Sequence, residues 1–367
     1  MSAPDLDAWH MSHALGLAER GRGAVEPNPM VGCVIARGAE IIGLGWHQRY
    51  GGPHAEIEAL AVAGSRAAGA TMYVTLEPCC HHGKTPPCTQ AVIAAGIRRV
   101  VAAMRDPFPA VSGGGFAELA AAGIEVVSGV QEEAARRLNA PYLKLLSAGR
   151  PWLIAKWAMT LDGKLATRTG HSQWISGEAS RRVAHELRGR VDAIVVGRGT
   201  AEADNPLLTA RPLGPRQAVR IVVDSRATLA SESQLVRTAS DAPVLVAAGP
   251  AALPADVRRL EMAGCEVFVA SAEAPGERLE ALLDELGRSR MTNVLVEGGA
   301  KLLGSCFDRR LVDEVHVFIA PRIAGGAGAA SPVGGEGIER MDQALGLEET
   351  TWRKLESDLY LTGRVAH

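Results

Sequence analysis

Aromatic residues are scarce in this chain, at 4% of its 367 residues, so its cores must consist mainly of alanine, valine, leucine and isoleucine. The chain also lacks any run of five like charges, and its formal net charge is only −2. A balanced charge without basic blocks argues against a partner such as nucleic acid or a membrane surface. No apolar stretch is long enough to span a bilayer, and residues 1–7 lack the apolar core of a secretory signal. We therefore expect a cytoplasmic protein.

The remaining composition, 47% hydrophobic and 22% charged, is typical of a globular enzyme. A chain of this length exceeds one ordinary core, so we expect two domains. Strand-like runs alternate with helical stretches, which predicts an α/β fold with substantial parallel pairing. The stretch 131–147 is predicted as a single long helix, and the step Gly149-Arg150-Pro151 follows it. We place the boundary there and predict domains 1–148 and 151–367.

Three of the six cysteines, Cys79, Cys80 and Cys88, fall within ten residues, and the segment His54-Ala55-Glu56 precedes them. An H-x-E segment followed by a P-C…C segment is typical of zinc deaminases. Catalytic zinc usually takes three protein ligands and leaves the fourth position to water. We therefore predict that His54, Cys79 and Cys88 bind Zn²⁺, and that Glu56 is the catalytic residue that carries protons from water to the leaving ammonia.

The main alternative is a structural zinc site, which would need a fourth protein ligand such as Cys80, His81 or His82. Adjacent residues after a strand point apart, which argues against Cys79 and Cys80 binding one ion together. A second alternative is a set of buried cysteines beside a surface histidine.

The second half of the chain has no G-x-G-x-x-G segment after a strand, so a Rossmann dinucleotide site is not supported. A predicted strand at 293–296 does lead into Glu297-Gly298-Gly299 and a helix. Such a turn exposes backbone N–H groups that suit a phosphate. It is equally typical of a tight strand-to-helix turn, and the residues alone leave both interpretations open.

Longer motifs occur along the chain in a specific order. They are Pro27–Gly32, Gly45–His47, His54–Glu56, Thr75–Cys88, Ala158–Lys164, Ser172–Ile175, Ala203–Thr209 and Val296–Gly299. In this order they closely resemble the bifunctional pyrimidine deaminase/reductase family of riboflavin biosynthesis. The resemblance implies an N-terminal cytidine-deaminase-like α/β/α domain and a C-terminal dihydrofolate-reductase-like α/β domain. It also implies zinc-dependent deamination of a diaminopyrimidinone with a phosphoribosylamino arm, then NADPH-dependent reduction of the ribosyl to a ribityl group.

The same resemblance assigns further residues, and we also expect the protein to form a homo-oligomer. The residues implied for NADPH are Ala158, Trp174, Thr200, Asp204, Ser225, Gly299, Ala300, Lys301, Leu302, Leu303, Gly304 and Ser305. Those implied for the substrate are Asn28, His47, Ser172, Arg188, Leu208, Arg211 and Glu297. Lys84 and Thr85 would line the mouth of the pyrimidine pocket, Lys156 and Asp162 would border the reactive ribose carbon, and Asp204 and Glu297 are candidate proton donors.

Two other functions remain open on these residues. One is a deaminase of nucleosides or nucleic-acid bases with an unrelated second domain, which the charge balance and the long second half disfavour. The other is a non-catalytic binding module stabilised by zinc, which a Glu56→Gln variant would distinguish.

Overall fold

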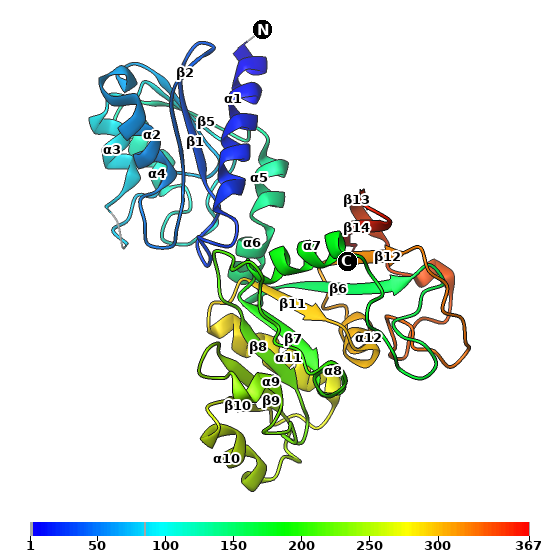
Figure 1. Cartoon of the computed structure of the whole chain (residues 1–367). Coiled ribbons are helices and arrows are strands. Elements are labelled where there is room, and N and C mark those ends of the chain that lie inside the picture. Colours follow the sequence, from blue (N-terminus) through cyan, green and yellow to red (C-terminus); the bar gives the residue numbers. More distant parts are fainter. Residues whose placement is uncertain (1–2, 84–85, 367) are drawn as a thin grey trace. The chain divides into compact units, whose positions relative to one another are not determined.

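The computed structural model describes residues 3–83 and 86–366, and the chain divides into two compact units, residues 1–148 and 149–367 (Figure 1). No helix in these described ranges combines the length and apolar character needed to cross a membrane. Each unit is built around one sheet, and each sheet has buried apolar clusters on both faces.

The N-terminal unit contains a five-stranded sheet in the order β2-β1-β3-β4-β5. Strand β1 is antiparallel to β2 and β3, whereas β3, β4 and β5 are parallel. The strands are β1 (Gly32–Arg37), β2 (Glu40–Trp46), β3 (Thr71–Val74), β4 (Arg99–Ala102) and β5 (Glu125–Ser128).

Helices cover both faces of this sheet, which gives three layers. The cluster on one face includes side chains of α2 (Ala55–Ala63), α3 (Cys88–Ala94) and α4 (Gly114–Ala121). The cluster on the other face includes side chains of α1 (Ala3–Ala18) and α5 (Glu132–Leu138). Helix α2 lies very close to β2, because a Cβ added at Gly45 would be 2.3 Å from the Ala55 carbonyl oxygen.

The prediction of one long helix over 131–147 is wrong. The structure has α5 and then α6 (Ala140–Ala148), with Asn139 between them. The buried Asn139 side chain accepts a hydrogen bond from Met30 N (2.8 Å) and donates one to Met30 O (3.0 Å). Pro141 lacks the N–H that would continue the helix ladder at this point. The break is therefore held by a tertiary contact that the helical periodicity does not reveal.

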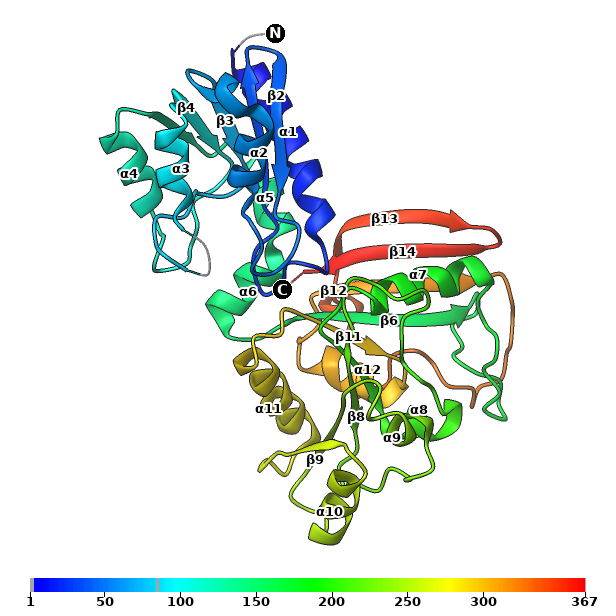
Figure 2. The same ribbon diagram turned by 60° about the vertical axis from the view of Figure 1, so that its left-hand side comes forward.

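The C-terminal unit contains a nine-stranded sheet in the order β10-β9-β8-β7-β11-β6-β12-β14-β13 (Figure 2). The seven strands from β10 to β12 are parallel, and β14 and β13 add an antiparallel hairpin. The parallel strands are β6 (Trp152–Thr160), β7 (Ala193–Gly197), β8 (Val219–Val223), β9 (Val244–Ala248), β10 (Glu266–Val269), β11 (Asn293–Glu297) and β12 (Glu314–Ala320).

The helices of this unit also divide between two faces. One apolar cluster includes side chains of α11 (Pro275–Arg288) and α12 (Ala300–Asp308). The other includes side chains of α7 (Glu178–Arg188), α8 (Arg198–Asp204), α9 (Gln234–Arg237) and α10 (Pro254–Met262). Because the strands between the two layers are parallel, their carboxyl ends meet along one edge of the sheet.

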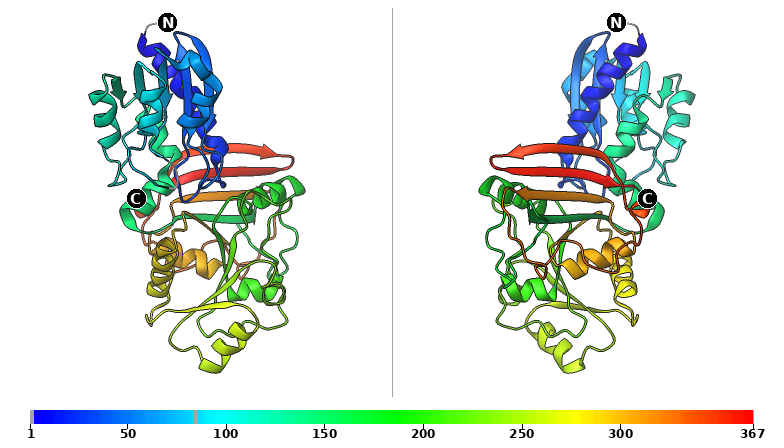
Figure 3. Two further views of the ribbon diagram at one scale, coloured as in Figure 1. Left: turned by 90° about the vertical axis from the view of Figure 1, so that its left-hand side faces the viewer. Right: turned by 90° about the vertical axis from the view of Figure 1, so that its right-hand side faces the viewer.

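The hairpin of β13 (Leu347–Leu355) and β14 (Asp358–Val365) runs beside β12 (Figure 3). The sequence analysis predicts no strand there. Eight of the nine residues of β13 are exposed, so this strand lacks the apolar alternation by which a half-buried strand is recognised.

Candidate active sites

The predicted zinc ligands come from three elements of the N-terminal unit that end near one another. His54 is the N-cap residue of α2, and Cys88 is the first residue of α3. Cys79 follows the carboxyl end of β3 and accepts a hydrogen bond from the Cys88 backbone N–H (3.4 Å). Two helix N-termini therefore face the thiol groups, and their partial positive charge favours thiolates.

The distances within this group fit a zinc ion. The His54 Nδ1 atom lies 3.5 Å from Cys79 Sγ and 3.3 Å from Cys88 Sγ. Ligand atoms on a tetrahedral zinc ion lie roughly 3.6 Å apart. Among the described residues, the group with all ligand atoms within 4.8 Å of one another consists of these three side chains. A hydrogen bond from Cys88, helped by His54, lowers the pKa of Cys79 to about 4.

The residues considered as a fourth protein ligand point elsewhere. The Cys80 thiol donates a long hydrogen bond to the Ala110 carbonyl (3.9 Å). The His81 ring lies against Phe108, with centroids 5.9 Å apart, and His82 is exposed. In the described part of the chain, the arrangement is therefore that of a three-ligand site with one position left for water.

Glu56 lies in the first turn of α2 and is only 3% exposed. Burial raises its pKa to about 6, so the carboxyl group can both accept and release a proton near neutral pH. Proton transfer in a hydrolytic deaminase requires a carboxylate that lies beside the metal ligands but does not itself bind the metal.

The predicted pyrimidine-pocket residues meet beside this group. Asn28 Nδ2 and His47 Nε2 are 3.3 Å apart, and the His47 and His54 ring centroids are separated by 5.4 Å. His47 Nδ1 must carry the proton, because it contacts the Pro53 carbonyl (2.9 Å), which can only accept. Burial lowers the pKa of His47, so its ring is neutral and its Nε2 accepts from Asn28. Lys84 and Thr85, predicted at the pocket mouth, lie outside the described residues.

Glu77 is a site residue that the sequence analysis missed. Its buried carboxylate accepts backbone N–H groups of Asp106 (3.2 Å), Gly113 (2.9 Å) and Phe116 (3.1 Å). These bonds tie the start of α4 and the preceding loop to the segment that carries Cys79. The sequence does contain a feature that could have identified Glu77, since an acidic residue stands at the end of a buried strand directly before Pro78-Cys79.

In the C-terminal unit the structure brings Arg188 and Glu297 into a bidentate ion pair, with Nε–Oε1 at 2.5 Å and Nη2–Oε2 at 2.9 Å. Lys156 Nζ lies 3.6 Å from Glu297 Oε2. Burial alone would raise the pKa of Glu297, but Arg188 and Lys156 lower it to about 2. Burial lowers the pKa of Lys156. The cluster therefore holds an ionised glutamate and a lysine that releases its proton more readily than usual.

Several of the residues predicted to bind NADPH lie at the carboxyl ends of neighbouring parallel strands. Ala158 is near the end of β6, Gly299 follows β11, Thr200 follows β7 and Ser225 follows β8. These four strands are consecutive in the sheet, in the order β8-β7-β11-β6. The predicted residues therefore form a row along one edge.

The α12 N-terminus fits a phosphate-bearing cofactor. Gly298 and Gly299 have φ values of 69° and 82°, and Gly299 provides no side chain to cap the helix. The first N–H groups of a helix have no partner within it, so those of α12 are available to a diphosphate. A Cβ at Gly299 would lie 3.0 Å from Thr200 Oγ1, which explains why glycine suits this close approach.

The other predicted residues of this segment have different surroundings. Leu302, Leu303 and Gly304 are buried, and a Cβ at Gly304 would be 2.3 Å from the Gly334 backbone. The Ser305 hydroxyl donates to the Lys301 carbonyl within the helix (3.1 Å). Contacts of this half of the segment with a cofactor would therefore involve backbone atoms at most.

The remaining substrate and cofactor predictions lie on loops around the same edge. Ser172 Oγ donates to Asp204 Oδ1 (3.5 Å), and the exposed Trp174 ring lies 4.9 Å from the Arg181 guanidinium carbon. Arg211 is exposed. The Leu208 side chain is buried in the core at a φ of 52°, so only its backbone remains for a ligand. Asp162 accepts N–H groups of Ala324 and Gly325 and holds that loop instead of facing Glu297.

Two family models match the chain. The RibD C-terminal domain matches residues 151–361, and the cytidine and deoxycytidylate deaminase zinc-binding region matches residues 4–104. The riboflavin biosynthesis protein RibD of Actinobacillus pleuropneumoniae is 41% identical over 360 residues, which are 97% of this chain and 94% of that protein. RibD of Escherichia coli is 41% identical over 342 residues, 87% of this chain and 89% of that protein.

Solved structures are similar over the whole length. RibD of Acinetobacter baumannii superposes with a TM-score of 0.86 at 34% identity and covers 100% of both chains. A diaminohydroxyphosphoribosylaminopyrimidine deaminase/5-amino-6-(5-phosphoribosylamino)uracil reductase of Thermotoga maritima gives a TM-score of 0.84 at 33% identity and covers 99% of both chains. These matches confirm the predicted fold class, a deaminase domain followed by a reductase domain.

Proposed function

Because this chain belongs to the RibD family of bifunctional deaminase/reductase enzymes of riboflavin biosynthesis, we propose that its two sites act on successive intermediates. The first would remove the 2-amino group of 2,5-diamino-6-(5-phosphoribosylamino)pyrimidin-4-one. The second would reduce the ribosyl group of that product to ribityl with NADPH. The main support is the group of His54, Cys79 and Cys88, with the buried Glu56 carboxyl beside it.

In the deaminase site, the pyrimidine ring binds next to the metal ligands. His54, Cys79 and Cys88 would hold a zinc ion, which when bound would polarise a water molecule for attack. Glu56 accepts a proton at its carboxylate as that water attacks the amino-bearing carbon, and it returns the proton to the leaving ammonia. Asn28 Nδ2 donates a hydrogen bond to His47 Nε2. The Asn28 Oδ1 atom is therefore left to accept a hydrogen bond from a pyrimidine N–H.

In the reductase site, NADPH supplies a hydride to C1′ of the sugar when it is bound. As the ring C1′–O4′ bond breaks, O4′ must gain a proton to become the 4′-hydroxyl of ribityl. Glu297 is a poor source of this proton, because its pKa is about 2 and it is ionised at neutral pH. We assign the proton to the Lys156 ammonium, which burial makes more acidic. Arg188 is held by Glu297, and Arg211 is exposed for the 5′-phosphate.

The cofactors proposed are therefore Zn²⁺ for the first unit and NADPH for the second. A cytoplasmic location is supported by the six cysteines, none of which forms a disulfide, as suits a reducing compartment. A homo-oligomer is also proposed, and the exposed edge strand β13 supports it, since unpaired strand edges readily pair with another chain. Light scattering after gel filtration measures the mass and tests this directly.

The deaminase proposal is tested with Glu56→Gln and a matched control, Glu58→Gln, on the same helix turn. Ammonia release from the phosphoribosylaminopyrimidine is followed with and without NADPH, and bound zinc is measured by atomic emission. Glu56→Gln should keep its zinc and lose about 10²–10⁴-fold in ammonia release. The control should retain wild-type turnover. Full turnover in zinc-loaded Glu56→Gln would mean that the proton-transfer role is wrong.

A further inference from the structure

One histidine of the C-terminal unit, His185, lies among charged groups of the candidate reductase site, and the proposed reaction does not use it. It is on α7 one helical turn before Arg188, and residues three apart on a helix share a face. His185 Nδ1 lies 3.1 Å from the Thr209 carbonyl oxygen. Arg188 Nη1 donates to the same oxygen at 3.5 Å. Two side chains of α7 therefore meet at one backbone carbonyl of the loop between α8 and β8.

This loop carries two of the residues proposed to bind the substrate, Leu208 and Arg211. Leu208 has a buried side chain, so its backbone is what remains for a ligand. The loop is attached to the end of α7 a second time, because Arg216 N donates to the Gly189 carbonyl (3.0 Å). Arg211 thus lies in a short stretch that is anchored to α7 on both sides, and the contact with His185 is one of these anchors.

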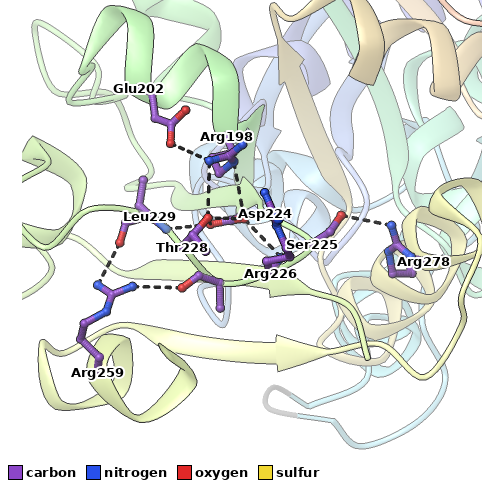
Figure 4. Close-up of polar contacts among 10 residues, drawn as sticks. Arg198, Glu202, Asp224, Ser225, Arg226, Thr228, Leu229, Arg259 and Arg278 are labelled. Carbon is purple, nitrogen blue, oxygen red and sulfur yellow. Dashed lines mark hydrogen bonds and ion pairs between the residues drawn. The ribbon is translucent and has the colours of Figure 1, made fainter. Parts of the chain in front are cut away.

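The Arg211 guanidinium has no partner in the part of the chain that the structure describes, where it forms neither a hydrogen bond nor an ion pair. Other arginines near the carboxyl ends of the strands do have partners (Figure 4). Arg198 pairs with Glu202 at 2.9 Å. Arg278 donates to the Ser225 hydroxyl at 3.1 Å. A guanidinium without such a partner is suited to the 5′-phosphate of the proposed substrate.

The Thr209 carbonyl determines which nitrogen of His185 carries a proton. A carbonyl oxygen can only accept, so Nδ1 must donate, and Nε2 keeps its lone pair in the neutral ring. Burial, Arg188 and Arg211 lower the pKa of His185, and the opposing effects of the Thr209 hydrogen bond and Glu297 are smaller. The ring is therefore neutral at neutral pH as long as no anion is bound nearby, and Nε2 is the atom at which it would gain a proton.

The charged groups around His185 come from several elements and are mostly positive. Arg188 on α7 pairs with Glu297 on β11 (2.9 Å), and Lys156 on β6 lies 3.6 Å from the same carboxylate. Arg211 adds a third cation from the loop. Further charged residues of α7 close to His185 in the sequence are Arg181, Arg182 and Glu186. Three cations against one buried carboxylate leave an excess of positive charge, which suits a phosphate dianion and keeps the histidine neutral before the dianion binds.

We propose that His185 is a positioning residue of the reductase, which holds the loop of Arg211 through the Thr209 carbonyl and takes up a proton at Nε2 when the phosphorylated substrate binds. This inference rests on the proposed reductase function, because it needs a sugar phosphate beside Arg188 and Arg211. The negative charge of the phosphate offsets the repulsion between the arginines and an imidazolium. The proton comes from solvent, and it gives the bound phosphate an additional cation.

The test is calorimetric binding of 5-amino-6-(5-phosphoribitylamino)uracil, the product of the proposed reaction, and of its dephosphorylated form to the full-length zinc-loaded protein. Titrations at pH 7 in two buffers of different ionisation enthalpy give the number of protons taken up. His185→Asn keeps an N–H group for the Thr209 carbonyl but cannot titrate. Wild-type protein should take up roughly 0.3–0.6 proton more than His185→Asn with the phosphorylated product, and no more than this variant with the dephosphorylated form.

The affinities separate positioning from protonation. His185→Asn should weaken the phosphorylated product about threefold, whereas His185→Ala, which also loses the hydrogen bond, should weaken it about tenfold or more. NADPH affinity should stay within about twofold of wild type in both variants, which shows that the unit is folded. His13→Gln is the matched control, because exposed His13 also has its Nδ1 on a backbone carbonyl (Trp9, 2.8 Å). It should match wild type in affinity and proton uptake.

Equal proton uptake by wild type and His185→Asn, with the product bound, would overturn this inference and leave the reductase proposal intact. So would unchanged product affinity in a folded His185→Ala protein, since the Thr209 contact would then position nothing that the product needs. Wild-type protein that binds neither NADPH nor the product would instead contradict the reductase proposal on which the inference rests.

Discussion

Two buried glutamates, one in each unit, differ in pKa because of their neighbours. Glu56 is buried beside His54 and the thiols of Cys79 and Cys88, and burial raises its pKa to about 6. Glu297 is equally buried, but Arg188 and Lys156 lower its pKa to about 2. The same side chain is therefore suited to the proposed proton transfer in one site, whereas in the other it is an anion paired with two cations.

Glu77 leads to a prediction at the scale of one residue. Glu77→Gln replaces one carboxylate oxygen by an N–H₂ group, which can only donate. The single remaining oxygen cannot accept all three N–H groups, those of Asp106, Gly113 and Phe116. We expect a loss of about 1–3 kcal/mol in the free energy of unfolding. Because this segment carries Cys79, zinc should also be released faster to a colorimetric chelator.

The control for this change is Glu125→Gln at an exposed position of β5. It should leave both the unfolding midpoint and the zinc release rate close to the wild-type values. A Glu77→Gln protein with wild-type zinc release would show that Glu77 does not position the metal ligand.

At the scale of elements, helix and strand ends bring the reacting groups together. The N-termini of α2 and α3 and the carboxyl end of β3 meet at the metal group, and glycines in β2 allow α2 to approach. In the second unit, the carboxyl ends of β6, β11, β7 and β8 form the corresponding row.

On the opposite face of the first sheet, α1 is attached by an ion pair. Asp7 accepts two hydrogen bonds from Arg99 on β4, both at 2.8 Å.

This ion pair predicts a pH-dependent stability. The Arg99 hydrogen bonds lower the pKa of Asp7 below its ordinary value of 3.8. A carboxyl group with a lowered pKa in the folded state stabilises the fold above its unfolded-state pKa and loses that effect as the pH falls through its folded-state pKa. At pH 7 the free energy of unfolding of the wild-type protein should therefore be about 1–3 kcal/mol higher than that of Asp7→Asn. The difference should decrease as the pH falls below 3.8.

Urea unfolding of the two proteins between pH 7 and pH 2 measures this difference. Glu125→Gln is again informative, because Glu125 also pairs with Arg99 but is 57% exposed. Its effect should stay below about 1 kcal/mol, as is usual for exposed ion pairs. A pH-independent gap between wild type and Asp7→Asn would contradict the assignment.

For the whole molecule, the central feature is that each unit has its own sheet, core and candidate site. Each half of the reaction sequence can therefore be removed separately. Cys88→Ser should abolish zinc binding and ammonia release while NADPH oxidation on pre-deaminated substrate continues at a rate within about twofold of wild type. The deaminase activity is measured as ammonia release, and the reductase activity is measured in parallel as the decrease in NADPH absorbance.

Cys306→Ser is a suitable control, since this buried thiol lies on α12 and outside the metal group. It should leave ammonia release intact. Simultaneous loss of both activities in Cys88→Ser would show that the two units depend on one another for folding or catalysis.

Much of this organisation can be predicted from local sequence. The alternation of strand-like and helical runs predicts the α/β class of both units, because apolar patterns agree with the local propensities in elements such as β8, β10 and α2. The break at Asn139 and the hairpin of β13 and β14 were not predicted. The break depends on the contact of Asn139 with Met30, which is 109 positions away, and β13 lacks the apolar alternation that would reveal a strand.

The sequence by itself determined the family, the order of the two domains and the three residues suited to zinc, because those depend on motifs of neighbouring residues. Only the tertiary structure decided the protonation of Glu297, the role of Glu77 and the pairing of Ser225 with Arg278. Ser225 and Arg278 are 53 positions apart, and Glu297 and Arg188 are 109 apart. The electrostatic properties of a buried group depend on such distant partners, and the residues adjacent to it in the sequence do not determine them.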